Sequence, residues 1–193
     1  MSNLIDVDWS RLPAPADDRA ADHLRGMTLP SVPLPATDGR TLDLATLAGL
    51  AVVYAYPMTG QPGVALPEGW DMIPGARGCT PQACAFRDHF AELQALGVNH
   101  VLGLSTQSTA DQREAASRLH LPFPLLSDDT LALTDALALP TFTAAGRRLL
   151  RRLTMIIADG HIVHVFYPVF PPHENASAVI AWLAAQHPQA SGN

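Results

Sequence analysis

AVVYAYPMTGQPGVALPEGWDMIPGARGCTPQACAFRDHF, residues 51–90, contains the elements that decide the fold. Its first six residues are apolar on both faces, which is typical of a central strand in a sheet covered by helices. A helix is predicted from Pro81, because Phe86 and Phe90 recur at helical spacing and Thr80 is a suitable N-cap before a first-turn proline. The segment therefore predicts a buried strand, a long connection and an amphipathic helix.

The rest of the chain continues this alternation of strands and helices. An apolar strand is expected at 98–105, a polar helix at 108–119, a short strand in FPLLS and a helix at 129–138. Strands at 153–158 and 161–167 are joined by an Asp159-Gly160 turn into a hairpin, and a last helix covers 173–186. This order predicts one α/β domain with a mixed central sheet and helices on both faces.

Three segments of different character divide the chain. Residues 1–27 are polar and rich in Asp, Ala and Pro, and we interpret them as an N-terminal extension. Residues 28–186 form the predicted domain, and residues 187–193 are expected to be a flexible tail. A chain of this length is expected to hold a single domain with a sizeable core.

Composition excludes several kinds of chemistry. All 12 basic residues are arginine, so Schiff-base chemistry on lysine and a lysine-containing phosphate loop are excluded. The formal net charge of −6 argues against nucleic acid as a partner. No apolar run is long enough for a membrane span and no secretory signal pattern is visible, so a cytoplasmic location is expected.

The two cysteines, Cys79 and Cys84, are the residues most suggestive of chemistry. Cys79 is expected in or just before the first turn of the helix, where free N–H groups favour an anion such as a thiolate. A small buried filler residue is the alternative interpretation of Cys79. In an unbroken helix, residues five apart have Cα atoms about 8.6 Å apart, whereas a disulfide needs about 4.4–6.8 Å. A bond between these cysteines therefore requires the helix to unwind locally.

The connection formed by residues 57–78 is unusually rich in Pro and Gly. Loops of about 20 residues without their own periodicity are uncommon in compact domains and are often functional. A tolerated surface insertion is the alternative, and the sequence leaves both open.

Several motifs together resemble one family. GCTPQACAFRDHF (78–90) is similar to the active-site helix of the peroxiredoxins of the Q type, also called bacterioferritin comigratory proteins. YAYP (54–57), FPLLSDD (123–129) and RLTMIIADGHIVHVF (152–166) resemble further blocks of that family, in the same order. The resemblance covers about residues 28–186 and implies a thioredoxin-like fold, which agrees with the predicted order of elements.

The resemblance also implies roles for individual residues. Cys79 resembles the peroxidatic cysteine, which attacks a hydroperoxide and becomes a sulfenic acid. Cys84 resembles the resolving cysteine, which condenses with it to an intramolecular disulfide that a thioredoxin-like or glutaredoxin-like protein then reduces. Arg152 occupies the position of the active-site arginine. The resemblance implies no metal and no organic cofactor.

One departure from the family pattern stands next to the active site. Counting back from Cys79, Ala76 occupies the place of the usual Thr or Ser, and Met72 the place of the usual proline. Thr59, which follows the strand closely, is our first candidate for the missing hydroxyl. Thr80 is the second candidate, although capping the helix is its simpler role.

Three classes of function are compatible with these residues. A thiol-dependent peroxidase is the first interpretation, with a hydroperoxide as substrate and either a monomer or a homodimer as the working unit. A redox-sensing binding module that uses the same disulfide switch is the alternative. A general disulfide reductase is disfavoured, because the cysteine spacing differs from C-x-x-C.

Overall fold

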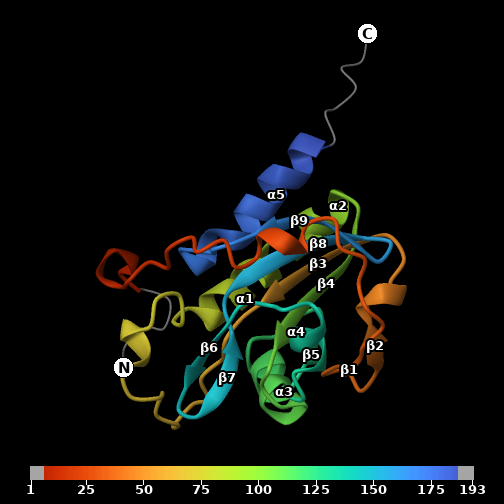
Figure 1. Ribbon diagram of the computed structural model, residues 1–193. Helices are drawn as coiled ribbons and strands as arrows, with labels where there is room; N and C mark the ends of the chain where they lie inside the picture. The colour runs from red at the N-terminus through yellow and green to blue at the C-terminus, as the bar shows by residue number, and fades with distance from the viewer. Residues whose placement is uncertain (1–6, 187–193) are drawn as a thin grey trace.

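The computed structural model describes residues 7–186, so the predicted tail at 187–193 lies outside the described residues. A five-stranded sheet with the strand order β5-β4-β3-β8-β9 forms its centre (Figure 1). Strand β3 runs parallel to β4 and antiparallel to β8, so the sheet is mixed as predicted. The strands are β3 (Leu50–Ala55), β4 (Val98–Ser105), β5 (Leu125–Ser127), β8 (Leu153–Ala158) and β9 (His161–Phe166).

Helices and short segments cover both faces of this sheet, which confirms the predicted thioredoxin-like architecture. On one face, side chains of three helices pack against Val52, Tyr54 and Ile156 of the sheet. On the other face, a short helix and parts of the N-terminal third pack against Val53 and Met155. The helices are α1 (Cys79–Asp88), α2 (Phe90–Ala95), α3 (Thr109–Arg118), α4 (Ala132–Ala136) and α5 (Asn175–Gln186), of which α1, α2 and α5 cover the first face and α4 the second.

Two small hairpins flank the sheet. Strands β1 (Pro33–Pro35) and β2 (Thr41–Asp43) pair on either side of the predicted Asp38-Gly39 turn. Strands β6 (Thr141–Ala144) and β7 (Arg147–Leu150) form a hairpin that the sequence did not predict. Its turn residue Ala145 has a positive φ of 48°. Alanine rarely adopts this conformation, so no sequence signal indicated a turn here.

The connection at 57–78 is packed against this unpredicted hairpin. It contains the 3-10 helix η4 (Trp70–Met72), and Trp70 is buried beside Phe142 of β6, with ring centroids 6.1 Å apart. Trp70, Ala76 and Leu149 share a small apolar cluster. The loop is therefore a folded part of the molecule that rests on the β6–β7 hairpin.

The N-terminal extension crosses the molecule and joins its core. Its 3-10 helices are η1 (Trp9–Arg11) and η2 (Asp22–Leu24), and Leu24 is fully buried. The backbone N–H of Gly26 donates to the carbonyl of Ile162 in β9 at 2.7 Å. Two other short 3-10 helices are η3 (Leu44–Thr46) and η5 (Pro172–Glu174). Within residues 7–186, no helix is long and apolar enough to cross a bilayer.

Candidate active site

Helix α1 begins two residues earlier than its local signals suggest. Gly78 is the N-cap, with a φ of 108°, and Cys79 is the first helical residue, so the prediction that Thr80 caps the helix is wrong. A Cβ on Gly78 would lie 2.3 Å from Pro172 and 2.7 Å from Trp9. Packing therefore requires glycine at this position and places the cap there. As a result, Cys79 lies where the free N–H groups of the helix end are found.

The sulfur of Cys79 contacts the guanidinium of Arg152. Cys79 is 4% exposed, and its Sγ lies 3.2 Å from Nη2 of Arg152 and 3.7 Å from the carbonyl oxygen of Ala76. Arg152 comes directly before β8 and is 3% exposed. A buried positive charge beside sulfur, together with the helix N-terminus, stabilises negative charge on that atom.

The same guanidinium holds the end of the loop that precedes Cys79. Its Nη2 lies 3.3, 3.2 and 3.3 Å from the carbonyl oxygens of Gly75, Ala76 and Arg77. Ala76 brings no hydroxyl to the site, but its carbonyl faces both Arg152 and Cys79. Met72, at the family's proline position, is 73% exposed in η4. At the position where the resemblance implies a hydroxyl, Ala76 therefore supplies only a carbonyl oxygen, which accepts hydrogen bonds and cannot donate one.

A network of buried polar side chains holds the guanidinium of Arg152 in position. Its Nη1 donates to Oε1 of Gln82 in α1, and Nε2 of Gln82 donates to Oδ1 of Asn175 at the start of α5 at 2.9 Å. The hydroxyl of Thr154 donates to the same oxygen of Asn175 at 2.7 Å. Gln82 and Thr154 are fully buried. Sequence reasoning missed this network, although a glutamine among the apolar positions of the helix was a visible signal.

Cys84 lies one and a half turns along α1 from Cys79. Both cysteines are free thiols, Cys79 buried and Cys84 half-buried. Burial raises the pKa of the Cys84 thiol, and Asp88 raises it further, whereas Arg87 acts in the opposite direction. Because both residues belong to one continuous helix, the cysteines meet only if α1 unwinds at its N-terminal end.

The hydroxyl of Thr59 is used elsewhere. Thr59 is 4% exposed, and its hydroxyl donates to Oε1 of Gln107 at 3.1 Å. The same oxygen accepts the backbone N–H of Thr59 at 2.8 Å. Within residues 7–186, no hydrogen bond joins Thr59 to Cys79. The structure therefore brings Cys79 and Arg152 into contact, places Cys84 further along the same helix, and pairs Thr59 with Gln107 instead of Cys79.

A cavity of about 330 Å³ opens beside Cys79. The loop at 57–78 supplies most of its wall, including Met58, Val64, Leu66 and Trp70, and Thr80 also lines it. Arg77 and Arg118 also line it, but each is paired with a carboxylate, Asp71 and Glu114 respectively. The cavity is thus largely apolar, and the sulfur of Cys79 is in its wall.

Comparisons with known proteins all find similarity to redoxins and peroxiredoxins. The family model described as Redoxin matches residues 24–180. Peroxiredoxin Bcp of Escherichia coli K12 is 32% identical over 163 residues, which cover 82% of this chain and 94% of that protein. The chloroplastic peroxiredoxin Q of Populus jackii is 36% identical over 106 residues, 54% of this chain and 42% of that protein. The chain therefore spans about two fifths of the chloroplastic relatives.

Solved structures show the same likeness in three dimensions. The peroxidoxin BcpB of Mycobacterium tuberculosis superposes with a TM-score of 0.67 at 25% identity, covering 83% of this chain and 96% of that one. A structure of peroxiredoxin Q from Xanthomonas campestris gives a TM-score of 0.63 at 25% identity, covering 81% and 96%. Both similarities extend over nearly the whole of the compared protein.

Proposed function

The chain belongs to the Redoxin family and, within it, to the peroxiredoxins of the Q and Bcp type, and from this premise we propose that it is a thiol-dependent peroxidase. One observation carries the proposal. The sulfur of Cys79 lies at a helix N-terminus, 3.2 Å from a buried guanidinium and in the wall of an open cavity. A nucleophile, a group that stabilises charge and space for a substrate therefore occur together.

The first step is attack of the Cys79 thiolate on the terminal oxygen of a hydroperoxide. The O–O bond breaks, Cys79 becomes a sulfenic acid, and the leaving alkoxide takes a proton to give an alcohol, or water from hydrogen peroxide. The forked donors of Arg152 suit both the thiolate and the oxygen on which negative charge develops.

The second step closes a disulfide within the chain. The sulfur of Cys84 attacks the sulfenic sulfur of Cys79, an S–S bond forms, and the hydroxyl leaves as water once protonated. A thioredoxin-like or glutaredoxin-like dithiol then restores both thiols by exchange and is itself oxidised to a disulfide. We place this cycle in the cytoplasm, where such reductants keep protein thiols reduced.

The cavity supports an organic hydroperoxide as the preferred substrate. Leu66 and Trp70 give it an apolar wall. The organic group of an alkyl hydroperoxide can pack on this wall, whereas hydrogen peroxide has no apolar group to do so. Leu66→Asp should lower kcat/KM for cumene hydroperoxide by about tenfold and leave that for hydrogen peroxide unchanged. Met72→Asp, on the exposed side of the same loop, is the matched control. Equal losses for both peroxides would argue against this preference.

NADPH consumption coupled through thioredoxin and its reductase tests the function itself. Cys79→Ser should abolish turnover. Cys84→Ser should leave one oxidation of Cys79 intact but block recycling, so that sulfinic acid accumulates. Full activity in Cys79→Ser would refute the assigned roles, and oxidation without turnover in the wild type would favour the redox-sensing module.

A further inference from the structure

An N-terminal strap, defined here as residues 7–18, lies over the start of the active-site helix. The family model begins at residue 24, so the strap lies outside the matched region. The ring of Trp9 packs on Gly78, the N-cap of α1, where its Cη2 and Cζ3 atoms are 2.7 and 3.1 Å from the position of a Cβ. An aromatic ring thus contacts the backbone one residue before Cys79.

Trp9 is held in this place by aromatic partners from the far end of the chain. Its ring stacks on His173 with centroids 5.4 Å apart and an interplanar angle of 22°. It meets Phe170 edge to face, with centroids 6.1 Å apart. Pro172, between these two, also packs on Gly78. Trp9 and Pro172 of η5 therefore pack together on the N-cap of α1.

The remainder of the strap follows the loop that leads into Cys79. Pro15 packs against Gly75, 3.3 Å from the position of a Cβ there. At its end, Asp18 accepts a hydrogen bond of 2.7 Å from the hydroxyl of Tyr167. The strap, drawn in red in Figure 1, is thus held near both ends and packs on Gly75 and Gly78.

We propose that Trp9 is a positioning residue that clamps the N-terminal turn of α1 in its folded form and thereby slows closure of the Cys79–Cys84 disulfide. The proposal rests on the proposed peroxidase function. Closure requires that turn to unwind, and unwinding displaces Gly78 from beneath the ring of Trp9. The sulfenic acid therefore persists longer, and a second hydroperoxide has time to oxidise it to sulfinic acid with release of one alcohol.

Rapid acid quench followed by intact-mass analysis tests this, because it separates the two steps. Reduced protein is mixed with cumene hydroperoxide, and the sulfenic, disulfide and sulfinic forms are followed in time. In Trp9→Ala, Cys79 oxidation should keep the wild-type rate and disulfide closure should become about tenfold faster, which corresponds to about 1.4 kcal/mol. The sulfinic fraction at excess hydroperoxide should fall. Trp9→Phe, which retains a ring, should restore slow closure in large part.

Trp182→Phe is the matched control, because the ring of Trp182 stacks on His164 of β9, with centroids 4.6 Å apart, and not on His173 as Trp9 does. It should close the disulfide at the wild-type rate. Unchanged or slower closure in Trp9→Ala would overturn the proposal while leaving the peroxidase function intact. Absence of Cys79 oxidation in the wild-type protein would instead overturn the function, and the role of Trp9 with it.

Discussion

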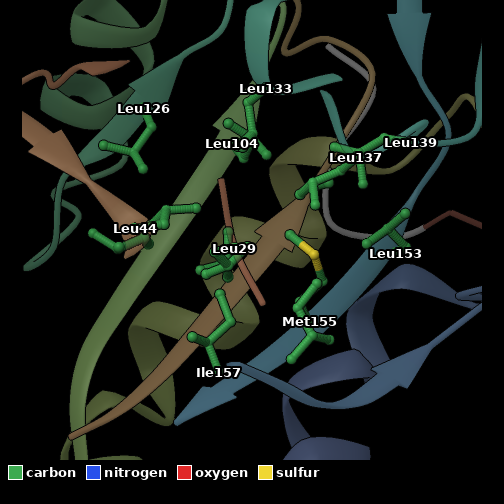
Figure 2. Packing of buried hydrophobic residues seen from close by; sticks show 14 of the residues in the cluster. Leu29, Leu44, Leu104, Leu126, Leu133, Leu137, Leu139, Leu153, Met155 and Ile157 are labelled. Carbon is green, nitrogen blue, oxygen red and sulfur yellow. The ribbon is translucent and has the colours of Figure 1, made fainter. Parts of the chain in front are cut away.

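The two faces of the central sheet use the same strands in different ways. On the face shown in Figure 2, Leu104, Leu153, Met155 and Ile157 belong to a cluster of buried side chains that is apolar throughout. On the opposite face, neighbouring residues of β8 and α1 bury polar groups beside apolar ones. Thr154 is fully buried next to Met155 in sequence, yet it hydrogen-bonds to Asn175.

This difference shows how the fold separates stability from chemistry. Burial on the apolar face is non-directional and tolerates small shifts of its members. Hydrogen bonds on the other face are directional, and Gln82 lies on the helix that must unwind during the proposed cycle. In the proposed cycle the apolar face therefore stays packed while the polar groups of the other face rearrange.

Replacing Arg152 should give the largest effect on activity and so best distinguish the role of the polar face from that of the apolar face. Arg152→Met removes the donor beside Cys79, and kcat/KM for hydroperoxide should fall by about 10²–10³-fold, as for loss of a donor that stabilises developing charge. Arg152→Lys keeps the charge without the planar fork and should recover only part of the activity. Steady-state kinetics with hydrogen peroxide measures both. Activity within twofold of wild type in Arg152→Met would show that the guanidinium is not used.

The converse change lies three residues after Arg152, in β8. Met155 is fully buried on the apolar face, and Met155→Ala should lower the free energy of unfolding by about 2–5 kcal/mol. Its kcat/KM, measured well below the unfolding temperature, should stay within twofold of wild type. Denaturant unfolding gives the first value, and Val163→Ala, at a site 37% exposed on β9, is the control with little expected loss. A large loss of kcat/KM in folded Met155→Ala would mean that the faces are coupled.

A change in the network behind Arg152 should have a smaller effect. Gln82→Met is similar in size but removes the hydrogen bonds to Arg152 and Asn175, so the guanidinium loses its orientation. We expect kcat/KM to fall by about tenfold, which corresponds to about 1.4 kcal/mol. Thr154→Val, at the far end of the network, should reduce it less. If Gln82→Met lowered the stability and left kcat/KM unchanged, the network would be structural only.

Local sequence patterns predicted the strands of the central sheet, and the motifs that resemble the family pointed to Cys79, Cys84 and Arg152, because these signals depend on residues close together in the sequence. The apolar run before Pro57 became β3, and the Asp159-Gly160 turn joined β8 to β9. The motif around Cys79 and the arginine before β8 indicated groups that lie 3.2 Å apart. The contribution of Cys84 followed from its position on the same helix.

The hydrogen-bond partners and the helix cap that the sequence did not predict depend on residues that are distant in the sequence. Thr59 was expected to serve Cys79, but Gln107, 48 positions away, takes its hydroxyl. Gln82 and Asn175 are 93 positions apart, and no local pattern pairs two amides. The cap at Gly78 replaced Thr80 because Trp9 and Pro172 pack there. In each case several residues could have made the hydrogen bond or capped the helix, and tertiary packing determined which of them does so.

The smallest expected effect is the pH dependence that Cys84 contributes to stability. Burial raises the pKa of Cys84, so the folded state keeps the thiol proton to higher pH than the unfolded state does. Its contribution is therefore complete below the ordinary thiol pKa of about 8.5 and is lost as pH rises through the folded value. Because the residue is only half-buried, solvent should limit the change to well under about 1 kcal/mol.

Unfolding of the reduced protein at pH 7, 9 and 10, compared between wild type and Cys84→Ser, isolates this contribution. As the pH rises, the unfolding free energy of the wild type should fall relative to that of Cys84→Ser. Only the wild type has the Cys84 thiol, whose ionisation costs more in the folded state than in the unfolded state. Met155→Ala, altered on the apolar face, should follow the wild-type pH dependence. A difference that is flat with pH, or that moves in favour of the wild type, would show that Cys84 is not desolvated in the folded state. The polar face would then lack this link between burial and ionisation.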